Sequence, residues 1–73
     1  MEKIKASELK QGDVIRVELW SNLWKKVAPT TCTVMDVHEW PGGNLSIMAK
    51  AMDGLKAYVT DIFTSADAEF VAA

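Results

Sequence analysis

Cys32 is the only cysteine and His38 the only histidine in this chain of 73 residues. A disulfide needs two sulfurs and a structural zinc needs several ligands, so the sequence offers neither kind of crosslink. A domain of this size buries only about 60% of the surface that its unfolded chain exposes. We therefore predict one small domain over residues 1–73 whose stability rests on side-chain packing or on a partner.

Alternating apolar and polar residues mark the first long strand. In VIRVELW, at residues 14–20, Ile15, Val17 and Leu19 fall on one side of an extended chain. Trp20 falls on the other, polar side. This period of two residues is typical of a half-buried strand. Further segments rich in β-forming residues, separated by turn residues, predict strands at 30–40, 45–52, 55–60 and about 69–71.

The length of the loop at Asp53-Gly54 decides which residues of the last long hairpin share a face. A two-residue Asp-Gly loop would mix Lys50 into the apolar side. A three-residue loop over 52–54, with the glycine last, instead pairs Ala51 with Leu55. It also pairs Ala49 with Ala57 and Ile47 with Val59. We predict the three-residue loop because it separates the two faces cleanly.

Four or five short strands joined by tight turns predict an all-β fold. A small five-stranded barrel of SH3-like or Greek-key topology fits this number of strands and would remove the exposed edges of the sheet. Two short helical turns complete the prediction. One covers residues 6–13 and ends at Gly12, and the other lies between Phe63 and Phe70.

The stretch LKQGDVIRV, at residues 9–17, resembles the beginning of many SH3-like small β-barrels. It has a leucine, a turn ending in Gly-Asp and then an alternating strand. The short helical turn expected before the last strand is similar as well. The resemblance implies a fold and no function. The chain lacks the acidic-aromatic motif of peptide-binding SH3 domains and the basic loop of the ribosomal and transcription-factor relatives.

No combination of residues indicates catalysis or metal binding. Cys32 and His38 would share a face of one strand, but six residues of extended chain separate them by roughly 20 Å, too far for a nucleophile and its base. The aspartates Asp13, Asp36, Asp53 and Asp61 are scattered, and PGGN, at 41–44, does not open a helix as a phosphate loop does. We predict a non-enzymatic protein without cofactor or metal.

Two tryptophans four residues apart, in WSNLWKK at 20–26, leave two geometries open. A three-residue loop would place Trp20 opposite Trp24 as an aromatic cross-strand pair. A long excursion from Trp20 to Pro29 would leave at least one indole at a rim, where tryptophan is enriched in binding hot spots. We expect one of the three tryptophans in the core. Our first functional prediction is protein binding or self-association through a surface around Trp20, Trp24 and Trp40.

Lysines interleaved with aromatic residues provide an alternative. In the predicted hairpin, Met48 faces Tyr58 and Lys50 faces Lys56, and such a face can track phosphates and stack on bases. The alternative function is nucleic-acid binding, for which the candidate residues are Lys25, Lys26, Lys50, Lys56 and Tyr58. A net charge of −2 argues against a polyanion as the main partner.

The remaining expectations concern location and origin. The first ten residues contain no apolar run like that of a signal peptide, and no segment approaches the ~20 apolar residues of a membrane span. We expect a cytoplasmic protein that does not bind membranes. Small domains without a catalytic signature are common among accessory proteins of phages and mobile elements, and we expect such an origin. The partner would be another protein or a second copy in a homo-oligomer.

Overall fold

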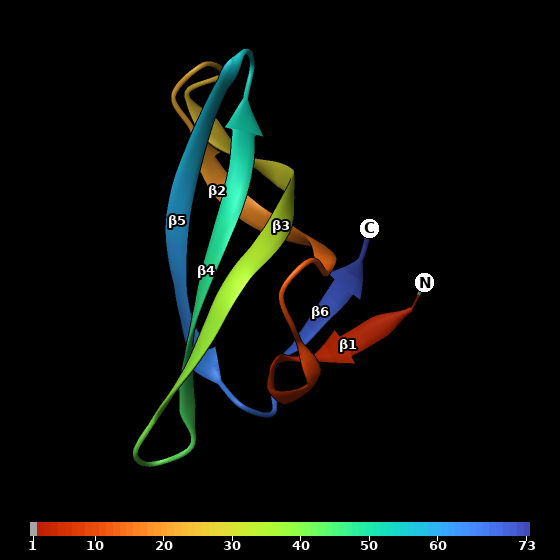
Figure 1. The fold of residues 1–73 in the computed structure, drawn as a ribbon. Coiled ribbons are helices and arrows are strands. Elements are labelled where there is room, and N and C mark those ends of the chain that lie inside the picture. The colour runs from red at the N-terminus through yellow and green to blue at the C-terminus, as the bar shows by residue number, and fades with distance from the viewer. Residues whose placement is uncertain (1) are drawn as a thin grey trace.

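The computed structural model describes residues 2–73, apart from the side chain of Asp53, and consists almost entirely of strands (Figure 1). The elements, in chain order, are β1 (Lys3–Lys5), a 3₁₀ turn η1 (Ala6–Glu8), β2 (Val14–Ser21), β3 (Lys26–Trp40), β4 (Asn44–Asp53), β5 (Lys56–Ser65) and β6 (Glu69–Ala72). The predicted all-β class is confirmed. Each strand predicted from the sequence has a counterpart, although β3 and β5 are considerably longer than predicted.

All six strands belong to one antiparallel sheet in the order β1-β6-β2-β3-β4-β5. The two end strands, β1 and β5, do not pair with each other, so the sheet of the described residues is not closed. The predicted five-stranded barrel is therefore not confirmed. The strand missing from the prediction is β1, which has three residues and is too short to show a period in the sequence. It lies beside β6, with Ile4 opposite Phe70.

The long strand β3 joins the two halves of the sheet. Its residues 26–33 pair with β2, and its residues 32–40 pair with β4. The register with β4 shifts by one between Val34 and Asp36, which makes Met35 a bulged residue, and a bulge bends a strand. Figure 1 shows the tips of the β2–β3 and β4–β5 hairpins at one end of the molecule and the β3–β4 turn at the other.

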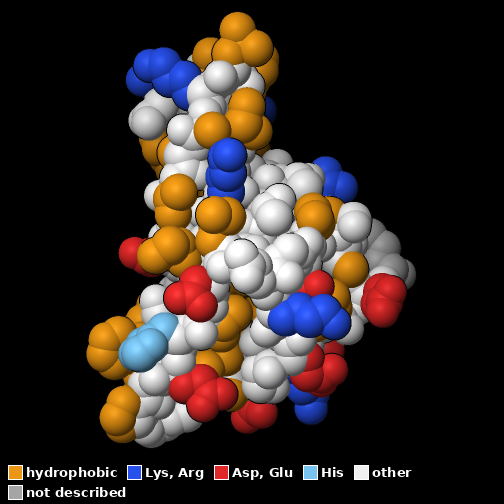
Figure 2. Space-filling model, in the orientation of Figure 1, with side chains coloured by type: hydrophobic (Ala, Val, Ile, Leu, Met, Phe, Trp, Pro, Cys, Tyr) orange, Lys and Arg blue, Asp and Glu red, His pale blue; other side chains and the backbone are white. Residues whose placement is uncertain are grey.

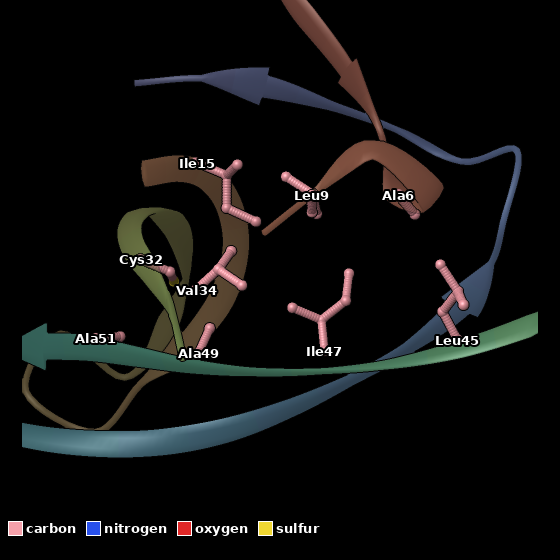
Figure 3. Packing of buried hydrophobic residues seen from close by; sticks show 9 residues of the cluster. All are labelled: Ala6, Leu9, Ile15, Cys32, Val34, Leu45, Ile47, Ala49 and Ala51. Carbon is pink, nitrogen blue, oxygen red and sulfur yellow. The ribbon is translucent and has the colours of Figure 1, made fainter. Parts of the chain in front are cut away.

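The core lies on the inner face of the bent sheet and is covered by η1 and the segment after it (Figure 3). Its buried hydrophobic residues are Ala6, Leu9, Ile15, Cys32, Val34, Leu45, Ile47, Ala49 and Ala51. Ile15, from β2, is fully buried, and Val17 and Leu19 are half-buried beside it, so the predicted inner face of β2 is confirmed. No aromatic side chain is buried in residues 2–73.

The predicted loop between β4 and β5 is wrong. The loop has two residues, Gly54 and Leu55, and Asp53 lies opposite Lys56. Gly54 takes the first position of the turn with a φ of +67°, the place of glycine in type II′ hairpins, whereas the prediction placed it last. Each expected pair therefore moves by three residues, so that Ile47 faces Ile62 and not Val59.

Neither predicted helical turn is present at its full length. The first begins as η1, and a separate hydrogen-bonded turn follows, in which Asp13 Oδ2 accepts the N–H of Lys10 at 3.0 Å. Gly12 lies in that second turn with a φ of +95°. The segment before β6 is a tight turn closed by a hydrogen bond from the N–H of Ala68 to the carbonyl of Ser65, at 3.2 Å.

We expect Gly54→Ala to lower the free energy of unfolding by about 1–2 kcal/mol, because φ near +67° disfavours any residue with a Cβ. The added Cβ would also lie 3.0 Å from Leu23 Cδ2. Urea unfolding followed by tryptophan fluorescence measures the change. Leu55→Ala is the control, since Leu55 is 100% exposed and should change stability by no more than about 0.5 kcal/mol. An unchanged Gly54→Ala variant would contradict this turn.

Candidate protein-binding surface

The β2–β3 hairpin ends in a four-residue loop, 22–25, between Ser21 and Lys26, which face each other. Ser21 is buried and anchors the loop. Its carbonyl accepts the N–H of Lys25 at 2.8 Å, and its hydroxyl accepts the N–H of Trp24 at 3.2 Å. Lys25 completes the turn in the left-handed region, with a φ of +56°. The loop thus presents Trp24 at the hairpin tip, 66% exposed.

Neither of the two geometries considered for the tryptophan pair is observed. Trp20 lies opposite Val27, not opposite Trp24, because the strand pairing continues past it by one residue. There is also no long excursion to Pro29, which is paired with Glu18 within the sheet. The predicted aromatic cross-strand pair is therefore absent from this hairpin.

Trp20 lies on the outer side of β2, as its position in the alternating pattern predicted. It is 55% exposed, and its indole N–H donates to Asn22 Oδ1 at 3.3 Å. The expectation that one of the three tryptophans lies in the core is wrong, since all three are exposed. The fully buried positions of this sheet hold small and aliphatic side chains in their place.

The tips of the β2–β3 and β4–β5 hairpins together form what we call the tip surface. Its exposed hydrophobic side chains are Trp20, Leu23, Trp24, Val27, Met52 and Leu55. Leu23 lies against Gly54 of the other hairpin, so the two tips touch. Between the hairpins lies a groove of about 570 Å³, with Trp24, Pro29 and Met52 among its lining residues. Hydrophobic side chains gather at this end of the molecule in Figure 2, beside basic side chains.

Trp40 lies at the opposite end of the sheet from the tip surface. It is the last residue of β3, beside the turn to β4 at the far end of the molecule (Figure 1). Its ring contacts that of His38 edge to face, with centroids 4.6 Å apart, and it remains 47% exposed. The structure thus brings Trp20 and Trp24 to one hairpin and separates them from Trp40.

Positive charge is concentrated at the end that carries the tip surface. Residues 18–29 and 50–58 contain four lysines and two acidic residues, a net charge of +2. The remaining positions contain four basic and eight acidic residues, a net charge of −4. On the face shown in Figure 2 the acidic side chains lie in the half away from the tips. The chain is therefore polarised, although its total charge is small.

The lysines and the tyrosine of the alternative site do not form the predicted sheet face. Lys50 lies on the outer face opposite Val59, so it does not face Lys56. Tyr58 lies opposite Ala51 on the inner side of β5 and is half-buried. Lys50 and Tyr58 nevertheless both line the groove between the hairpins. The other three lysines, Lys25, Lys26 and Lys56, lie at the hairpin tips.

Cys32 and His38 lie on opposite faces of β3. The bulge at Met35 reverses the alternation, so Cys32 points into the core and His38 points outwards. Their predicted common face is therefore wrong. No group of three or more side chains that could hold a metal ion occurs among the described residues. No helix in residues 2–73 is long and apolar enough to cross a membrane.

Several exposed hydrophobic residues were missed by the sequence analysis. Leu23, Val27, Met52 and Leu55 complete the tip surface, and Phe63 projects from the outer face of β5, 67% exposed. Extending the alternation of β5 beyond residue 60 in the correct register would have placed Phe63 outwards. The two leucines belong to loops, where the alternation gives no information on orientation.

Comparison of the chain with protein-family models, with curated protein sequences and with solved structures gives no match.

We expect Cys32 to react with a thiol reagent such as 5,5′-dithiobis(2-nitrobenzoic acid) on the order of 100-fold more slowly in the folded protein than in guanidinium. Its side chain is buried, its thiol donates to the carbonyl of Thr30 at 3.8 Å, and burial raises the pKa of the thiol above its ordinary value. Stopped-flow absorbance at pH 8 measures both rates. Equal rates would place Cys32 at the surface and contradict the core described above.

Proposed function

We propose that this chain is a non-enzymatic binding module that docks another protein, or a second copy of itself, through the tip surface, with Trp24 at its centre. The observation that carries the proposal is the distribution of large side chains. All three tryptophans and Phe63 are exposed, whereas the largest fully buried side chains are Ile15, Ile47 and Val34. A core without aromatic residues leaves the most hydrophobic surface of the chain available to a partner.

The composition of the tip surface supports the same interpretation. Contiguous apolar patches on small proteins commonly mark interaction sites, and tryptophan is enriched among the residues that dominate binding energy. Trp24 lines the groove, and Lys25, Lys26 and Lys56 lie at the two hairpin tips, near the apolar side chains. An apolar centre with a polar rim is the usual anatomy of a protein interface. The positive charge of this end favours a partner with an acidic rim.

We expect Trp24→Ala to weaken association more than folding. Surface truncations usually change stability by about 0.5 kcal/mol, whereas truncation of a hot-spot residue costs roughly 2 kcal/mol or more of binding energy. Thermal unfolding and sedimentation equilibrium on the same purified variant measure both effects, together with capture of partners from a lysate. Ile47→Ala is the contrasting control, because removal of a fully buried aliphatic side chain typically costs about 2–5 kcal/mol of stability.

The proposal is contradicted by either of two outcomes. One is a Trp24→Ala variant that is largely unfolded, which would make Trp24 a structural residue. The other is a folded variant whose association through the tip surface, including capture of partners, is unchanged. Trp40→Ala, at the far end of the sheet, should leave association through the tip surface unaffected, and so separates this site from the remaining exposed tryptophan.

Nucleic-acid binding remains the second candidate, and the concentration of lysines near the tips favours it. Binding to phosphates weakens steeply with salt, because each neutralised phosphate releases counterions. For such a site we would expect the affinity for a fluorescent dT20 oligonucleotide to fall at least tenfold between 50 and 200 mM salt. The charge-reversed pair Lys25→Glu and Lys26→Glu would abolish binding. Our first proposal predicts no measurable binding to dT20 at either salt concentration.

A further inference from the structure

The strand β5 forms a long free edge of the sheet. It has ten residues, and within the described part of the chain it pairs with β4 alone. The other end of the sheet, β1, has only three residues. A strand edge presents a row of backbone N–H and C=O groups that can pair with a further strand. At ten residues, β5 is long enough for a stable pairing.

The usual protections of an edge strand are absent from the middle of β5. Natural edges are commonly blocked by lysine, proline or a bulge. Residues 57–65 contain neither lysine nor proline, the pairing with β4 shows no register shift, and Asp61 is the single charged residue. The inner side of β5 is also incompletely covered. Its inward residues are only half-buried, whereas the inward residues of the neighbouring β4 are buried. The hydrophobic core is therefore partly exposed to solvent along β5.

The hydrogen-bonding pattern of β5 follows from its two-residue turn. In such a turn the flanking residues, here Asp53 and Lys56, form a hydrogen-bonded pair, and bonded pairs then alternate along the ladder. Even-numbered residues from Lys56 to Thr64 therefore direct their backbone groups towards β4. Odd-numbered residues from Ala57 to Ser65 direct theirs to the free edge. These five residues are the ones that a further strand can bond.

We infer that β5 pairs antiparallel with β5 of a second copy, in a two-fold dimer whose axis passes beside Thr60. In this register Thr60 faces Thr60 of the second copy, a favourable cross-strand pair. On the outer face, the large Phe63 lies opposite the small Ala57. On the inner face, Tyr58 lies opposite Ile62, so that two half-buried side chains cover each other. Each of these pairs occurs twice because of the symmetry.

Registers shifted by one step of the ladder fit less well. With the axis beside Asp61, the two Asp61 carboxylates face each other, and like charges directly opposite are destabilising. With the axis beside Val59, Phe63 lies opposite Leu55, which belongs to the turn and not to the strand. In the register centred on Thr60, Asp61 lies opposite Val59 of the second copy. Within that copy, Val59 pairs with Lys50 of β4. The negative charge of Asp61 then lies on the same face as the positive charge of Lys50 in the second copy, one strand further away.

This interface uses a different part of the molecule from the proposed function and does not depend on Trp24. It is also different in kind, because backbone hydrogen bonds contribute as well as apolar contacts. Failure of either proposal can therefore be recognised separately. A dimer that survives Trp24→Ala supports the edge interface alone, and loss of the edge interface leaves the tip surface to be tested by itself.

A symmetric disulfide tests the register directly. In the background Cys32→Ala, Thr60→Cys places two thiols at a non-hydrogen-bonded pair, where the Cα atoms are ~4.5 Å apart, within disulfide range. Air oxidation should give a covalent dimer in high yield. The matched control Thr64→Cys places its two thiols roughly 27 Å apart and should remain monomeric on a non-reducing gel. Equal crosslinking of both variants, or of neither, would overturn the inference.

Sedimentation velocity on proteins without added cysteine tests the interface itself. We expect the parent chain to be a dimer at 100 μM, and Val59→Pro to weaken dimerisation at least tenfold. Proline at this position removes an N–H that points to the free edge, so the β4–β5 pairing is retained. Asp61→Lys, at an exposed position, should weaken dimerisation in the same way without any change in the backbone. A monomeric parent at 100 μM, or a dimer that resists both variants, would overturn the inference.

Discussion

The pairing of β3 on both of its sides is the interaction on which the rest of this structure depends. Residues 26–33 bond to β2 and residues 32–40 bond to β4, so one strand joins both halves of the sheet. The bulge at Met35 lets this strand bend while Val34 and Val37, on either side of it, both face inwards. With no disulfide available, this bend encloses the core.

The small size of that core explains the character of the surface. The buried part of the inner face holds alanines, a cysteine and medium-sized aliphatic residues, and no tryptophan. The tryptophans consequently occupy the outer face and a turn, where they contribute little to folding. Hydrophobic surface that folding does not bury remains available for association. The binding proposed above would then have the same origin as the small core of this chain.

The alternation of apolar and polar residues correctly predicted which side of a regular strand each residue faces. The alternation in β2 correctly placed Ile15 inwards and Trp20 outwards, because both residues lie in a regular strand. The register of the β4–β5 hairpin was not predictable in this way, since Gly54 can occupy different positions in loops of similar length. No residue type marks the bulge at Met35 in the sequence. The bulge places His38 on the opposite face of β3 from the one predicted. No local sequence feature distinguishes an edge strand of a sheet from a central one. That β5 has a free edge is therefore known only from the order of the strands in the sheet.

The two proposed interfaces are compatible in geometry. The tip surface lies at one end of the β4–β5 hairpin, and the free edge runs along the side of the same hairpin. Antiparallel pairing of two β5 strands would point the two hairpins in opposite directions and leave both tip surfaces uncovered. Such a dimer would carry two identical binding sites at its opposite ends. A target with two matching sites at that spacing would then be bound more tightly than by one copy, because the second contact is intramolecular.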